Sequence, residues 1–137
     1  MEKIPSSVFE NTDLLVNVSN FYILDTNYTK AYDLLKKANQ MTPNNFVIFY
    51  NLGVCAYYLS EENFKVSNEL DVQGDKSAAM IHKTKSENFL LEAQTYFERV
   101  HQTEPQDINV MYTLRSIYAR LQSPKYEEME GKIKAAE

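Results

Sequence analysis

The sequence predicts an all-α protein of antiparallel helical hairpins arranged as a repeat, with about six helices and an elongated middle hairpin. Apolar residues recur at intervals of three and four along most of the chain, which is the period of amphipathic helices. Glycine is scarce, at three residues, and the four prolines stand between the periodic segments rather than within them. Because sheets need more turn residues than this, the composition disfavours a β-rich fold.

Length and charge limit the class of protein. At 137 residues the chain is long enough for a single domain, 1–137, and too short for two. A net charge of −5 without a Lys or Arg cluster disfavours nucleic acid and anionic membranes as partners. No apolar run reaches the ~18 residues of a membrane span, so we expect no membrane insertion. Met1 is not followed by a signal-peptide pattern, so the chain looks soluble and cytoplasmic, or periplasmic if a signal peptide has been removed.

The first hairpin needs two helices. Ser7 and Glu10 have the spacing of a capping box, which predicts that a helix begins there. Asp25-Thr26-Asn27 interrupts the apolar pattern; Asn27 can cap a second helix, which Thr42-Pro43 ends. The apolar stripes are Leu14, Leu15, Val18, Phe21 and Tyr22, then Tyr28, Ala31, Leu34, Leu35 and Ala38.

A long middle hairpin is expected to follow. Asn44-Asn45 can cap its first helix, and Gly74 followed by Asp75 marks its turn. The two helices, 46–73 and 75–103, would then have about seven turns each. Beyond Leu59 their contact is expected to rest on a thin apolar seam of Phe64, Val66, Leu70, Val72, Ala79, Met80 and Ile81. The alternative is a disordered insertion around 66–84, which the single glycine and the lack of proline disfavour.

The last hairpin is expected to be short. Gln106-Asp107 precedes a helix with apolar residues at helical spacing, and Ser123-Pro124 interrupts it before a final helix. The apolar residues are Ile108, Met111, Leu114, Ile117, Tyr118 and Leu121, then Tyr126, Met129 and Ile133.

The chain shows self-similarity when it is aligned on Pro43 and Pro105. Tyr28-x-x-Ala31 precedes the first proline at the offset at which Leu90-x-x-Ala93 precedes the second, and Phe49-x-x-Leu52 follows the first as Met111-x-x-Leu114 follows the second. Small residues such as Ala31, Gly53 and Ala93 would let paired helices approach closely, and hairpins with one apolar face must stack. We therefore expect three repeat units, about 7–45, 46–105 and 106–137.

These features resemble the tetratricopeptide repeat family. Segment 12–45 has the standard length, and Tyr50-Asn51-Leu52-Gly53 matches the family's first helix. Arg115 stands where the family has glycine, and the two aligned prolines lie nearly twice as far apart as the family's period of about 34 residues. The long middle hairpin and the last segments are similar to tetratricopeptide proteins of Bacteroidetes-type bacteria.

No motif indicates catalysis, a metal or a cofactor. His82 and His101 lack the spacing of metal ligands, and Cys55 lies in an apolar helix as a core thiol. No nucleophile stands beside a base in a known motif. We therefore expect a protein that is not an enzyme and binds no cofactor.

The resemblance implies a partner-binding groove along the first helices of the units. Phe49, Leu52, Gly53 and Ala56 are expected to face the hairpin mate, so the stripe at i, i+4 and i+7 that begins at Tyr50 lies elsewhere. The candidate groove residues are Asn20, Tyr50, Asn51, Val54, Tyr57, Tyr112 and Ser116. Alternatively, the tyrosines simply pack between hairpins. Val16, Asn109 and Thr113 replace cations with which some family members hold a C-terminal carboxylate, so we do not expect that form of binding.

Two functions fit this pattern. The first is a non-catalytic interaction module or scaffold that binds a partner protein or peptide through its helical groove. The alternative is a self-associating structural module that forms a homodimer through the long middle hairpin.

Overall fold

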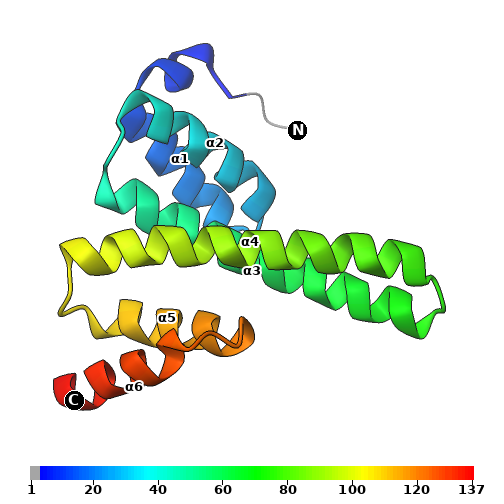
Figure 1. Ribbon diagram of the computed structural model, residues 1–137. Helices are drawn as coiled ribbons and strands as arrows, with labels where there is room; N and C mark the ends of the chain where they lie inside the picture. Colours follow the sequence, from blue (N-terminus) through cyan, green and yellow to red (C-terminus); the bar gives the residue numbers. More distant parts are fainter. Residues whose placement is uncertain (1–3) are drawn as a thin grey trace.

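The chain folds into six α-helices after a short 3-10 turn, as a computed structural model shows for residues 4–137 (Figure 1). The 3-10 turn η1 spans Ser6–Glu10; the helices are α1 Thr12–Leu24, α2 Tyr28–Met41, α3 Phe46–Val72, α4 Lys76–Thr103, α5 Ile108–Arg120 and α6 Lys125–Ala136. Residues 4–137 contain no β-strand, which confirms the all-α prediction. No helix in this part of the chain is long and apolar enough to cross a membrane.

Side-chain caps begin four of the helices at the expected positions. Asn27, Asn45, Asp75 and Asp107 each accept a hydrogen bond from a backbone amide in the first turn of α2, α3, α4 and α5. Gly74 has a φ of +88°, the left-handed conformation that lets the chain leave α3 and turn into α4.

The capping box predicted at the N-terminus is wrong. Residues Ser6–Glu10 form only the 3-10 turn, whose start at Pro5 has no side-chain cap. Helix α1 begins later, where Asn11 accepts a hydrogen bond of 3.2 Å from the amide of Leu14. Pro5 fixes the backbone two residues before Ser7, which lies inside the 3-10 turn, whereas Asn11 has the extended conformation that a cap needs.

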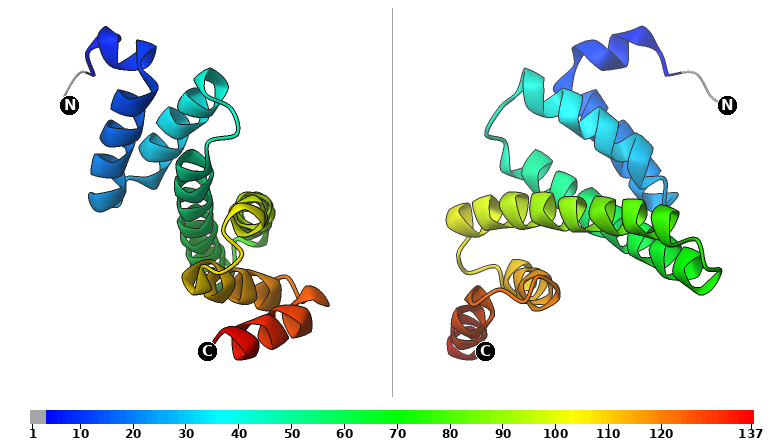
Figure 2. Two further views of the ribbon diagram at one scale, coloured as in Figure 1. Left: turned by 90° about the vertical axis from the view of Figure 1, so that its left-hand side faces the viewer. Right: turned by 45° about the vertical axis from the view of Figure 1, so that its right-hand side comes forward.

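The helices pair into three antiparallel hairpins that stack in sequence order (Figures 1 and 2). Within the hairpins α1 packs on α2, α3 on α4 and α5 on α6; between them, α2 packs on α3 and α4 on α5. Every extensive contact therefore joins elements that are adjacent in the sequence. The middle hairpin, with helices of 27 and 28 residues, extends well beyond both neighbours.

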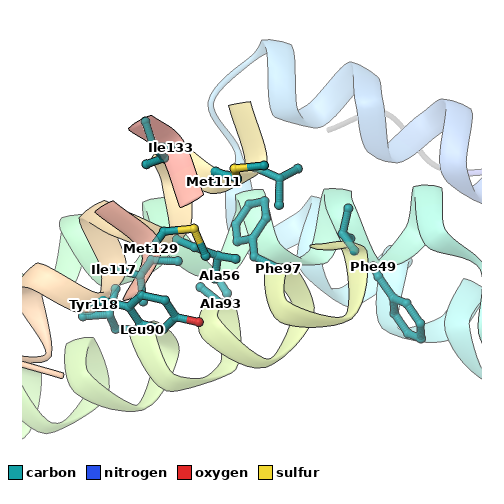
Figure 3. Packing of buried hydrophobic residues seen from close by; sticks show 13 residues of the cluster. Phe49, Ala56, Leu90, Ala93, Phe97, Met111, Ile117, Tyr118, Met129 and Ile133 are labelled. Atoms are coloured by element: carbon teal, nitrogen blue, oxygen red, sulfur yellow. The ribbon is translucent and has the colours of Figure 1, made fainter. Parts of the chain in front are cut away.

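Two hydrophobic clusters form the core, one on each side of α3. Ile48, Leu52, Cys55 and Leu59 of α3 pack with the first hairpin, whereas Phe49 and Ala56 join α4, α5 and α6 (Figure 3). Leu52 was expected to face its own hairpin mate, but it belongs to the cluster with α1 and α2. The difference arises because α3 is buried on two sides, and Leu52 lies on the side of the preceding hairpin.

The predicted close approaches occur. Ala31 and Ala93 are fully buried, and a Cβ atom added to Gly53 would lie 2.8 Å from Cε2 of Phe97. The ring of Phe97 in α4 therefore occupies the space that any larger residue at position 53 would need.

The distal part of the middle hairpin is helical, but the predicted apolar seam is wrong. Of its seven residues only Ala79 is buried; Leu70 is half-buried, and Phe64, Val66, Val72, Met80 and Ile81 are exposed. Small residues hold the helices together instead. Ser60 and Ser67 of α3 are buried, and so are Ala79 and Ser86 of α4. The hydroxyl of Ser67 donates to the carbonyl of Ala79 at 2.7 Å. Small side chains at the contact let the two helix backbones approach closely. The large apolar side chains lie on the exposed faces of the hairpin instead.

Candidate functional site

A pocket of about 420 Å³ lies where the first helices of the second and third hairpins meet. It is lined by Tyr50, Val54, Tyr57 and Tyr58 of α3, Phe97 of α4, and Tyr112, Thr113 and Ser116 of α5. The residues of α3 fall on one helical stripe because 50, 54 and 57 are separated by four and three positions. The short third hairpin stacks on α4 and brings α5 beside that stripe.

Aromatic rings make most of the pocket wall and support one another. The ring of Tyr50 meets that of Phe97 edge to face, with centroids 5.6 Å apart. Tyr57 and Tyr58 meet in the same way at 5.8 Å, and Tyr58 stacks on Tyr28 of the first hairpin at 4.7 Å. Contacts of this kind fix ring positions before a ligand arrives, which lowers the entropy lost on binding.

The polar atoms of the pocket are mostly neutral hydroxyls. Ser116 donates to the carbonyl of Tyr112 at 3.2 Å and Thr113 donates to that of Asn109 at 3.0 Å, so their oxygens keep free lone pairs. The hydroxyl of Tyr112 donates to a carboxylate oxygen of Glu137 at 2.9 Å. The hydroxyl of Tyr50 has no protein partner among residues 4–137. The pocket thus offers both apolar area and hydrogen-bonding groups.

Two arginines of α5 lie beside the pocket: Arg115, whose guanidinium is 5.2 Å from the ring centroid of Tyr112, and Arg120 at the end of the helix. The guanidinium of Arg120 lies 5.7 Å from the ring centroid of Tyr57 and 5.9 Å from that of Phe64, and it donates to the hydroxyl of Ser60 at 3.2 Å. Burial raises the pKa of Tyr57; the charge of Glu61 also raises it, while Arg120 lowers it. These contacts hold the exposed Arg120 in place through cation–π attraction.

The seven candidate groove residues fall into two groups. Tyr50, Val54, Tyr57, Tyr112 and Ser116 line the pocket together. Asn20 and Asn51 are not part of its lining; the amide of Asn51 donates to the oxygen of Asn20 at 3.2 Å, linking α1 to α3. Tyr57 also packs between hairpins, against Arg120 and the cluster shared with α5 and α6, whereas Tyr50 touches Phe97 within its own hairpin. Lining the pocket and packing between hairpins are therefore compatible for Tyr57.

Sequence reasoning missed Tyr58, Phe97 and Arg120. Phe97 belongs to the core cluster, and its ring also reaches the pocket because Gly53 leaves room for it. Tyr58 directly follows Tyr57 and was not included in the stripe of Tyr50, Val54 and Tyr57. An arginine in the last turn of a helix is too common to have indicated the position of Arg120.

Cys55 is not placed as a nucleophile. Cys55 is fully buried, and its burial raises the pKa of the thiol to about 12, so it is a thiol rather than a nucleophilic thiolate at neutral pH. Among residues 4–137, no three His, Cys, Asp or Glu side chains lie close enough together to share a metal ion.

Comparisons with known proteins show the fold. No protein-family model matches the sequence, and no curated protein matches it significantly. Among solved structures the chain is similar to a monomeric mutant of IFIT1 with Gppp-AAAA and to a further monomeric IFIT1 mutant with m7Gppp-AAAA. In each comparison the TM-score is 0.71 and the identity is 18%, over 91% of this chain and 25% of that chain. The chain thus spans about a quarter of the length of IFIT1, and the similarity establishes a helical-repeat fold.

Proposed function

We propose that this chain is a non-catalytic interaction module of the tetratricopeptide type that binds a peptide segment of a partner protein. The pocket between α3 and α5 carries the proposal, because its wall is aromatic, partly exposed and built from the first helices of adjacent hairpins. Tyrosines suit such a surface, since each offers a large apolar area and a hydroxyl at a small entropy cost.

The aromatic wall and the hydroxyl groups of the pocket together favour a partner side chain that is largely apolar and ends in a polar group. Its volume of about 420 Å³ is enough for a few side chains. The structures of IFIT1 contain capped RNA fragments, but RNA binding requires clustered cations along the phosphate backbone. The chain has a net charge of −5, and the cations beside the pocket rings are Arg120 and Arg115, the second of which is paired with Glu130. These charges support a protein partner in preference to RNA.

A crosslinking experiment tests this function. A photoreactive amino acid replaces Tyr50 or Tyr112 in the pocket, and in a control protein it replaces Glu128 on the outer face of α6. We expect the pocket positions to capture a protein that the α6 position does not. Val54→Glu should abolish the capture, because it places a charge in the apolar part of the pocket. If the pocket positions and the control position crosslinked to the same proteins, the result would contradict the proposal.

Affinity provides the second test once a partner is captured. Tyr50→Ala and Tyr112→Ala should each weaken binding by about tenfold or more, as expected for aromatic residues at the centre of an interface. Lys134→Ala, on the exposed face of α6, serves as the matched control and should leave the affinity unchanged.

Self-association through the middle hairpin is the second candidate function. Its distal part exposes Phe64, Val72, Met80 and Ile81, and exposed apolar residues that gather on one element often mark an interface. Sedimentation over a range of concentrations tests this function. A dimer that dissociates in the variants Met80→Glu and Ile81→Glu would support it, and a monomer at all concentrations would exclude it.

A further inference from the structure

A second cavity, of about 690 Å³, lies where the middle hairpin extends beyond the end of α5. Helix α5 ends at Arg120, while α3 and α4 continue toward Gly74 (Figure 1). The end of α5 forms one wall of this cavity and the distal part of the middle hairpin forms the other. We call it the notch; among the residues that line it are Phe64, Lys83, Glu87, Leu91 and Arg120.

Arg120 connects the notch to the aromatic pocket. Its guanidinium lies 5.7 Å from the ring centroid of Tyr57, which lines the pocket, and 5.9 Å from that of Phe64, which lines the notch. Arg120 follows the pocket residue Ser116 by one helical turn on α5, and Phe64 follows Tyr57 by two turns on α3. The pocket and the notch therefore form one continuous surface along the two helices.

The guanidinium of Arg120 is held in place without an ion-pair partner. It donates to the buried hydroxyl of Ser60, which uses only one of its five N–H groups. Within residues 4–137, no carboxylate forms a salt bridge with Arg120 or with Lys83. Arg115, in contrast, is paired with Glu130 at 2.7 Å. Arg120 thus presents a positioned positive charge with donors left for a ligand.

The other groups of the notch show which ligand would suit it. Two cations, Lys83 and Arg120, and one acid, Glu87, line it, so its lining has an excess of positive charge in a chain whose net charge is −5. Phe64 and Leu91 are 50% and 49% exposed, so apolar area lies beside these cations. A peptide that has an acidic residue next to an apolar one complements this combination.

We infer that the peptide bound by the aromatic pocket continues into the notch and places an aspartate or glutamate side chain on Arg120. An apolar residue of the same peptide then covers Phe64 and Leu91. A carboxylate can accept two parallel N–H bonds from the planar guanidinium, a geometry that a lysine cannot offer. The inference rests on the proposed function and adds the chemistry of the partner, which is an acidic peptide, and the residue that selects it.

Glu61 opposes this interaction. It is exposed on α3, between Tyr57 and Phe64 in the sequence, and its charge raises the pKa of Tyr57. A peptide carboxylate on Arg120 would therefore feel repulsion from Glu61. Removal of this acid should strengthen binding of an acidic peptide and leave a neutral one unaffected, which gives the test a change of opposite sign.

The test uses the full chain and a phage-displayed library of random peptides. Peptides are selected on the unmodified chain, on Arg120→Gln and on Lys65→Gln, which removes the same charge at an exposed position of α3 outside both cavities. Tyr50→Ala identifies the peptides that use the aromatic pocket. We expect these peptides to be enriched in aspartate or glutamate beside an apolar residue. The acidic enrichment should disappear on Arg120→Gln and persist on Lys65→Gln.

Affinities of one selected peptide separate recognition from a structural role of Arg120. Replacing the acidic residue of the peptide with its amide should weaken binding to the unmodified chain by about threefold to tenfold, and should change binding to Arg120→Gln little. Arg120→Lys, which keeps the charge, should restore part of the preference. Glu61→Gln should bind the acidic peptide more tightly and the amide form unchanged. A purely structural role would make Arg120→Gln weaken both peptides equally.

The possible failures are distinguishable. Peptides that depend on Tyr50 but show no acidic enrichment, or that lose acidic and amide binding equally on Arg120→Gln, would overturn the inference and leave the proposed function standing. Acidic peptides that depend on Lys65 as much as on Arg120 would also overturn it, because general charge attraction would then explain them. If no selected peptide depended on Tyr50, the proposed function and the inference would both be wrong.

Discussion

The hydroxyl oxygens of Ser60 and Ser86 lie 3.1 Å apart between α3 and α4, and each hydroxyl can donate to the main-chain carbonyl of the other residue, at 2.8 and 2.7 Å. Both serines are buried. If one helix slid along the other by a turn, these hydroxyls would lose their partners while still shielded from water, at a cost of ~1–3 kcal/mol each. The serine pair therefore fixes the register of the middle hairpin.

Ser86→Ala should lower the free energy of unfolding by about 1 kcal/mol, because it removes one buried hydrogen-bonding group and leaves the carbonyl of Ser60 without that donor. Ser77→Ala, at an exposed position in the first turn of α4, is the control and should change stability little. Urea unfolding measures both. Equal midpoints for the two variants would show that the serine pair does not contribute to stability.

Gly53→Ala should destabilise the protein by ~1–3 kcal/mol, since the new Cβ would press on the ring of Phe97 at 2.8 Å. Gly131→Ala, in α6, meets no atom within 4 Å and should instead stabilise by ~0.5–1 kcal/mol, because alanine favours the helix. The opposite signs of the two changes can be read from thermal unfolding. A stabilising Gly53→Ala would mean that Phe97 moves aside freely.

Stability should fall as pH rises between about 9 and 12. Burial raises the pKa of the Cys55 thiol from 9.0 to about 12, so above pH 9 the unfolded chain loses this proton more readily than the folded chain does. The free energy of unfolding keeps its full value with respect to this thiol below pH 9. It then falls by ~1.4 kcal/mol per pH unit until pH 12, where the folded chain loses the same proton. Urea midpoints from pH 8 to 11 should fall less steeply in Cys55→Ala. Identical slopes would argue against a buried thiol. The pKa of Tyr32 is also raised, by burial and by its hydrogen bond to Glu92, and this adds to the slope in both proteins.

Hydrogen exchange should quicken along the middle hairpin toward Gly74. The segments 61–73 and 75–88 extend beyond the neighbouring hairpins and bury few side chains, so local opening there needs less free energy than at 46–58. Exchange resolved by residue measures this gradient. Protection at 61–88 as strong as at 46–58 would instead indicate that another molecule covers the hairpin.

The helices and their order could be predicted from the sequence because their signals are local. Asn27, Asn45, Asp75 and Asp107 are caps that act within one turn, and Gly74 marks its own turn. The start of α1 could not be placed in the same way. Two hydroxyl residues and Asn11 compete there as caps, and the conformation after Pro5 decides between them.

The inner face of the middle hairpin was misjudged because apolar residues were taken as the sign of a buried seam. Serine is as common on a surface as in such a contact, so Ser60, Ser67 and Ser86 gave no signal one by one. The spacing of the small residues does contain a signal. Gly53, Ser60 and Ser67 recur every seven residues in α3, as Ala79, Ser86 and Ala93 do in α4. A heptad of small residues on two antiparallel helices predicts close packing.

The pocket was partly predictable. The stripe of Tyr50, Val54 and Tyr57 follows from helical spacing, and Tyr112 and Ser116 follow from the repeat alignment. The corresponding residue of the first unit, Asn20, does not line this pocket but bonds to Asn51. Which units meet closely enough to form a pocket depends on how the hairpins stack, and sequence spacing alone does not contain that information.

Because each helix packs mainly on its neighbours in the sequence, the molecule should fold quickly. During synthesis η1, α1 and α2 can pair as soon as they emerge, and α3 then adds to a surface that already exists. No step has to wait for a distant part of the chain, so few partly folded forms with exposed core residues should accumulate. The same arrangement means that a disturbance in the third hairpin can reach the first only through the middle one.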